Sequence, residues 1–139
     1  MLNKYDAMLS GVRECDDYWY DVAMSDAIDF LQHFSEVEWT GLKGLVNERP
    51  AVWQVSCAET LSESADQERS FDLLTTLLMI GNDDVTVAAL DSINALASYG
   101  LDITGKAKQL RSAIGKTRDS PGAAVSRMLA ALEEKLPSA

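Results

Sequence analysis

The chain reads WQVSCAETL over Trp53–Leu61 and, 32 residues later, VTVAALDSI over Val85–Ile93. A second matched pair precedes these segments, WTGLKGLV over Trp39–Val46 and FDLLTTLL over Phe71–Leu78. The copies keep the character of the side chains as well as their spacing. Self-similarity at such a period is typical of stacked helical-repeat proteins, in which one unit cannot bury its apolar face alone. Such folds usually bind other molecules, so the repeat favours recognition over catalysis.

The apolar positions of the repeat predict four helices, at about 38–47, 50–63, 67–80 and 82–98. Pro50 suits the first position of the second of these helices. Gly81 and Gly100 are placed to end the third and the fourth. In the segment Asn82-Asp83, either side chain can cap the helix that follows.

The segments on either side of the repeat are less regular. Apolar spacing predicts one helix over 2–12 and another from about residue 25, whereas the sequence alone leaves 16–21 without an assigned structure. After residue 100, Ala107–Ile114 matches Phe71–Leu78 at an offset of 36, and Ser120-Pro121 opens a last helix. No segment shows the alternation of a strand.

These patterns predict an all-α fold, a HEAT/ARM-like α-solenoid of antiparallel helical pairs with an N-terminal helical cap. A single domain covers 1–139, divided into the cap at 1–35, repeats at 36–66 and 67–100, and a degenerate repeat at 101–139. A chain of this length can bury a continuous core.

The charge balance indicates the kind of partner. There are 22 acidic residues against 12 Lys and Arg, a formal charge of −10, which argues against nucleic acid because phosphate binding needs basic side chains. No Lys or Arg lies between Arg13 and Lys43, whereas the segment after residue 105 is rich in both. We therefore expect a basic protein as the partner. The two oppositely charged ends also leave head-to-tail self-association open, and the sequence does not set the oligomeric state.

Cysteines and the N-terminus indicate the compartment. Cys15 and Cys57 have no metal-ligand or redox spacing, and Cys57 aligns with Ala89 of the next unit, so we expect a buried free thiol. The first residues show no leader pattern, and no apolar run approaches the roughly 20 residues of a membrane span. We expect a cytoplasmic protein without a membrane partner.

The segment Asp83–Ile93 resembles the second helix of a HEAT repeat, with an aspartate turn, a valine and then small residues and a leucine. Residues 50–61 are similar, with Trp53 where a smaller aliphatic residue is usual. The resemblance covers about 36–99. HEAT units often carry a basic residue after the valine, and this chain has Thr86 and Gln54 there, so the resemblance concerns architecture and no particular subfamily.

In size, acidity and layout the chain also resembles the immunity proteins that bacteria make against polymorphic or contact-dependent growth inhibition toxins. This resemblance implies a cytoplasmic inhibitor that covers the active site of a cationic toxin, a nuclease in the most specific form of the hypothesis. The alternative is a HEAT-like adaptor or chaperone that holds a basic protein without inhibiting an enzyme.

The sequence offers little for catalysis, a metal or a cofactor. His33 is the only histidine and belongs to no metal-binding motif, and Gly115-Lys116-Thr117 lacks the upstream glycine of a phosphate-binding loop, since position 110 is Leu110. We therefore expect no enzyme activity, no metal and no cofactor. A small acidic enzyme that uses Asp26 and Asp29 is the third alternative.

Candidate binding residues gather before residue 39. Three consecutive aromatics in a helix cannot all point into one core, because neighbours are about 100° apart, so at least one of them is expected at the surface. There the aromatics would anchor a partner and the acids would steer it; in the alternative arrangement Trp19 packs inward and both tyrosines reach the surface. The predicted residues of this segment are Asp16, Asp17, Tyr18, Trp19, Tyr20, Asp21, Asp26, Asp29, Glu36 and Glu38.

Two further acids, Glu59 and Asp91, occupy equivalent positions of the two repeats. Stacked units would align them about 10 Å apart, the usual helix-packing distance. We predict that they extend the binding surface as an acidic column, with plain solvent exposure as the alternative.

Overall fold

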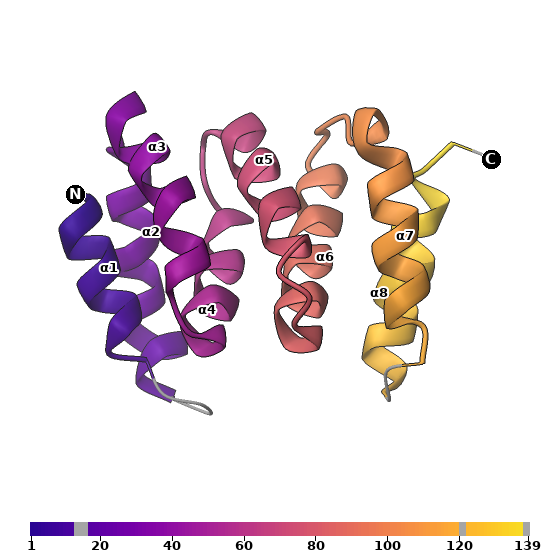
Figure 1. Ribbon diagram of the computed structural model, residues 1–139, viewed down its shortest axis with the longest axis horizontal. Helices are drawn as coiled ribbons and strands as arrows, with labels where there is room; N and C mark the ends of the chain where they lie inside the picture. The colour runs from indigo at the N-terminus through magenta and orange to yellow at the C-terminus, as the bar shows by residue number, and fades with distance from the viewer. Residues whose placement is uncertain (13–16, 120–121, 138–139) are drawn as a thin grey trace.

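The protein is described by a computed structural model that covers residues 1–12, 17–119 and 122–137. These residues form helices and no strand, so the class is all-α. The helices follow one another along the long axis of the molecule, from α1 at one end to α7 and α8 at the other (Figure 1). The α-helices are α1 Leu2–Ser10, α2 Met24–Gln32, α3 Glu36–Leu45, α4 Ala51–Leu61, α5 Gln67–Leu78, α6 Asp83–Ser98, α7 Ala107–Thr117 and α8 Ala123–Glu134.

Three short helical segments lie between the α-helices. A π-helical segment, Trp19–Ala23, leads directly into α2, and 3₁₀ turns lie at Val46–Glu48 and Thr104–Lys106. The π-helical segment occupies part of 16–21, for which the sequence predicts no particular structure. The predicted helix start at Ser120-Pro121 and the residue Cys15 lie outside the described residues.

The four helices predicted from the repeat are present as α3 to α6. Asn82 caps α6 as expected, its side-chain oxygen accepting from the backbone N–H of Val85 at 3.1 Å. Gly81 and Gly100 take positive φ values of 85° and 106°, the left-handed conformation that ends a helix. Pro50 differs from its predicted place, since it immediately precedes α4 with an extended backbone.

The core is built on α4 and α6, which pack against each other and each against α5. Their repeated positions are buried in pairs, so that Trp53 matches Val85 and Leu61 matches Ile93. Trp39 and Trp53 both belong to this core, at 8% and 1% exposure, as predicted. The 32-residue repeat in the sequence is therefore a repeat of core positions.

Cys57 lies at the centre of α4, fully buried and unpaired, which confirms the predicted free thiol. Burial raises the pKa of this thiol to about 12. The thiolate, which is the reactive form, is thus scarce at neutral pH.

Equivalent hydroxyl groups link each repeat to the element before it. Ser92 of α6 donates to the backbone oxygen of Ala58 in α4 at 2.6 Å. Thr60, its counterpart in α4, shares a hydrogen bond of 2.7 Å with the hydroxyl of Tyr5 in α1. Both bonds are buried, so they fix the register between elements where water cannot compete.

A second set of contacts holds α1 on α4. Arg49 donates to both carboxylate oxygens of Asp6, at 2.9 and 2.8 Å, and the indole N–H of Trp53 donates to Asp6 at 3.0 Å. The rings of Tyr5 and Trp53 meet edge to face at 6.3 Å. The N-terminal helix is therefore joined to the first repeat by polar and aromatic contacts together.

The C-terminal end continues the core. Leu110, Ile114 and Leu132 are buried, and Gln109 of α7 donates to the backbone oxygen of Thr75 in α5 at 2.9 Å. α8 packs against α6. The weaker match of 107–114 to 71–78 in the sequence thus corresponds to buried positions in α7.

Candidate functional site

Exposed apolar side chains surrounded by acids form a surface over the start of α2, here called the acidic-aromatic surface. Tyr18, Tyr20 and Val22 are exposed by 62%, 58% and 45%. The π-helical turn places Trp19 and Ala23 inward and leaves the residues between them facing out. The acidic-aromatic surface consists of Tyr18, Tyr20, Val22, Asp17, Asp21, Asp26 and Asp29.

Trp19 does not belong to the acidic-aromatic surface. Its side chain is 2% exposed and lies in the core, so it cannot make direct contact with a partner as proposed from the sequence. The reason is the helical geometry, which lets only one of three consecutive aromatics face the core. Asp16 lies outside the described residues.

The acids of the acidic-aromatic surface have no basic partner among the described residues. The ion pairs within the described residues involve other acids, and no Lys or Arg belongs to α2 or to the segment Asp17–Ala23. Asp26 and Asp29 are exposed on α2. Negative charge beside exposed apolar area, with no described cation paired to it, would attract a basic surface.

Glu36 and Glu38 each bind a group within the fold. Glu38 forms a capping box with Ser35, accepts from the backbone N–H of Leu2 at 2.7 Å and pairs with the amino group of Met1 at 2.9 Å. These donors lower the pKa of Glu38 to about 2, the Met1 amino group most of all. Glu36 pairs with Arg69 of α5 at 2.7 Å. Glu38 therefore joins the start of α3 to α1, whereas the side chain of Glu36 is 87% exposed and remains accessible to a partner.

Glu59 and Asp91 come together with the N-terminal aromatics. Glu59 is partly buried on α4, whereas Asp91 is exposed on α6. Burial raises the pKa of Glu59 and the charge of Asp91 raises it further, while hydrogen bonding to Tyr20 and Trp19 acts in the opposite direction. Tyr20 and Asp91 thus both influence Glu59, and they belong to two other elements, the π-helical segment and α6.

The indole nitrogen of Trp19 lies near Glu59 without a hydrogen bond to it. This nitrogen is buried and has no hydrogen-bond partner of good geometry, yet it lies close enough to Glu59 to favour the ionised carboxylate.

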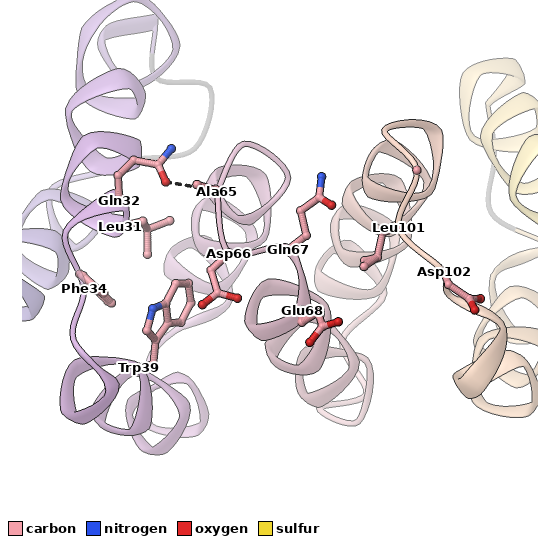
Figure 2. A pocket seen from close by; sticks show the side chains of 11 residues that line it. Leu31, Gln32, Phe34, Trp39, Ala65, Asp66, Gln67, Glu68, Leu101 and Asp102 are labelled. Carbon is pink, nitrogen blue, oxygen red and sulfur yellow. Dashed lines mark hydrogen bonds between the residues drawn. The ribbon is translucent and has the colours of Figure 1, made fainter.

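A groove that the sequence did not predict lies where three loops meet (Figure 2). Its volume is about 730 Å³, and it is lined from the end of α2 to the loop after α6. Two of its acids already cap helical turns, since Asp66 accepts from the backbone of Arg69 and Asp102 from that of Thr104. The residues that line the groove are Leu31, Gln32, Phe34, Trp39, Ala65, Asp66, Gln67, Glu68, Gly100, Leu101 and Asp102.

The helix pattern of the sequence does not reveal this groove, because many of its lining residues lie in or beside three separate loops between the predicted helices. Gln32 bridges two of them, accepting from the backbone N–H of Ala65 at 2.8 Å, a bond drawn in Figure 2. This bond fixes one wall of the groove. Its acids are partly engaged and its apolar wall is small, so the acidic-aromatic surface is the better candidate for a protein partner.

A metal site and a membrane span each need a distinct arrangement of residues. No group of three or more His, Cys, Asp or Glu side chains in the described ranges is arranged to hold a metal ion. Among the described helices, none is both long enough and apolar enough to cross a membrane. In comparisons with protein-family models, curated proteins and solved structures, nothing matches this chain.

Proposed function

We propose that this chain is an immunity protein, a protein-binding inhibitor that covers the active site of a cationic bacterial toxin, a nuclease. The observation that carries the proposal is the acidic-aromatic surface, where Tyr18, Tyr20 and Val22 are exposed among acids that have no basic partner within the described residues. Aromatic anchors rimmed by charge are typical of protein interfaces. The substrate cleft of a nuclease is basic, and an acidic surface competes for it with the nucleic acid.

The arrangement of the helices supports a binding role. We propose that α3 with α4, and α5 with α6, are antiparallel pairs of a HEAT/ARM-like solenoid, with α1 and α2 as its cap and α7 and α8 as its last unit. The equivalent hydroxyl bonds of Thr60 and Ser92 and the paired burial of α4 and α6 support this assignment. A solenoid presents a large rigid surface, which suits inhibition by coverage.

A growth assay tests the proposal. The coding segment next to this gene, expressed in a susceptible host, should kill cells, and co-expression of this chain should restore growth. Killing that persists in the presence of this chain would refute the immunity role for that toxin. If the neighbouring segment does not affect growth with or without this chain, the alternative of an adaptor that holds a basic protein in the cytoplasm becomes the better account.

The position of the binding surface has its own test. Reversing Asp26 and Asp29 to Lys should abolish rescue and slow association with the toxin at least tenfold at low salt, because the field that steers the partner is inverted. The matched control reverses Asp119 and Glu134, which are also exposed but lie at the C-terminal end. Rescue that is lost equally in both variants would refute the assignment of the surface while leaving the immunity role intact.

A further inference from the structure

The groove where three loops meet has walls that hydrogen bonds and ring contacts hold in place. Gln32 joins the end of α2 to the segment after α4 through both atoms of its amide, accepting from the backbone N–H of Ala65 at 2.8 Å and donating to the backbone oxygen of Glu63 at 3.2 Å. The rings of Phe34 and Trp39, which meet edge to face at 5.4 Å, form part of its apolar lining (Figure 2). A preformed hollow of about 730 Å³ has the size that small ligands occupy.

The charged side chains that line the groove are acids, and no Lys or Arg belongs to its described lining. Asp66 and Glu68 come from the cap and first turn of α5, and Asp102 comes from the loop after α6 (Figure 2). All three are exposed. Arg69 meets Asp66 at 3.5 Å, whereas its closer ion pair, at 2.7 Å, is with Glu36. No described ion pair involves Glu68 or Asp102.

Two of these acids are held in a fixed orientation by capping bonds. Oδ1 of Asp66 accepts from the backbone N–H of Arg69 at 3.1 Å. Oδ1 of Asp102 accepts both from the hydroxyl of Thr104 at 2.6 Å and from its backbone N–H at 3.0 Å. These bonds, that of the hydroxyl most of all, lower the pKa of Asp102, so this carboxylate is ionised at neutral pH. Its second oxygen accepts no described hydrogen bond and can bind a donor from a ligand.

We propose that the groove is a binding site for a linear aliphatic polyamine, whose ammonium groups contact Asp66, Glu68 and Asp102 while the methylene segments between them cross the apolar lining. This site goes beyond the proposed function and does not depend on it. The acids belong to two separate loops, and no group of side chains in the described ranges is arranged to hold a metal ion, so the negative charge is spread along the groove. A cation whose charges are spread along a chain matches this arrangement better than a single ion does.

The apolar lining favours a thin ligand. Leu31 and Trp39 are only 2% and 8% exposed, and Phe34 and Leu101 are partly buried. Little apolar area is therefore left to receive the side chains of a peptide, whereas a methylene chain needs only a narrow strip. An ammonium group can also lie against an aromatic ring. We expect a basic peptide of the same charge to bind more weakly than a polyamine.

Isothermal titration calorimetry of the full chain with spermine, at physiological ionic strength, provides the test. The variants are Glu68→Gln alone and the triple variant Asp66→Asn/Glu68→Gln/Asp102→Asn, in which asparagine keeps an oxygen for each capping bond. We expect Glu68→Gln to weaken the binding of spermine about threefold and the triple variant to weaken it about thirtyfold. In ¹⁵N–¹H spectra, spermine should move the backbone amides of 66–68 and 100–102, and the same spectra show whether each variant is folded.

The matched control is Asp84→Asn/Asp119→Asn/Glu134→Gln, which removes as much charge from exposed residues that do not line the groove. It should bind spermine nearly as the native chain does, because salt screens distant charges. No binding to the native chain at millimolar spermine, or equal losses of affinity in the two triple variants, would overturn the site. Tighter binding of acetylated tetra-lysine amide, which carries the same charge as spermine, would overturn the polyamine in favour of a basic peptide.

Discussion

The segments 36–66 and 67–98 have the same sequence pattern and bury many of the same positions, yet they differ in what covers them. In the first, α1 and α2 both pack on α4, and its acid Glu59 is partly buried. In the second, the equivalent Asp91 stays exposed. A repeat therefore fixes the core, whereas the elements packed outside it decide which repeated position is covered and which is exposed.

The largest difference should appear when the equivalent core residues are truncated. Trp53→Ala should lower the free energy of unfolding by about 3–5 kcal/mol, and Val85→Ala by about 2 kcal/mol, because the larger side chain leaves the larger cavity. Both side chains are at most 1% exposed, so burial is matched. Urea denaturation followed by circular dichroism measures both values. Equal losses would mean that the two segments do not share one packing arrangement.

The contact that α1 makes with the first segment has no counterpart among the described contacts of the second. Asp6→Asn removes the ion pair with Arg49 and should cost about 2 kcal/mol at pH 7, since charged hydrogen bonds are lost. Arg49 holds the pKa of Asp6 below its usual value, so this contribution is present above the unfolded pKa of about 4 and is lost as the pH falls through the folded pKa.

Thermal melts of Asp6→Asn and the native chain from pH 7 down to pH 3 test the prediction. The gap between their midpoints should narrow on acidification. Asp119→Asn serves as the control, because this aspartate is exposed and its replacement should leave the midpoint unchanged. A gap that stays constant with pH would show that Asp6 acts through packing and not through its charge.

The smallest effect concerns the two equivalent acids themselves. The folded protein raises the pKa of Glu59, so its ionisation costs stability above the unfolded pKa, and Glu59→Gln should raise the melting midpoint at pH 7 by about 1–3 °C. The gain should shrink as the pH falls through the unfolded pKa of about 4, and vanish well below it, where Glu59 is neutral in both states. Asp91→Asn should gain less, because Asp91 is exposed. A lower melting midpoint for Glu59→Gln than for the native chain would contradict the prediction that ionised Glu59 destabilises the fold.

The sequence was a good guide wherever burial followed the repeat. Trp39, Trp53 and Cys57 were predicted in the core because their counterparts are apolar or small, and all three are buried. The cap at Asn82 and the glycine ends of the helices were predicted from local backbone chemistry, which does not depend on distant contacts.

The rest depends on contacts between segments far apart in the chain. The π-helical turn at Trp19–Ala23 places Trp19 in the core, and nothing in 16–21 alone indicates it. Glu38 and Glu59 look alike in the sequence, but one caps α3 and the other meets aromatics from the cap. The groove is formed by three loops, and its shape follows only from how the helices stack.

The thiol of Cys57 can report how often α4 opens in the folded protein. It is fully buried at the middle of α4, so a thiol reagent can modify it only in molecules in which α4 has opened. In a Cys15→Ser background, the rate of modification therefore reports the population of that opened state. The chain thus contains a chemical probe of local unfolding in the segment that carries Glu59, and the segment with Ala89 at the equivalent position has none.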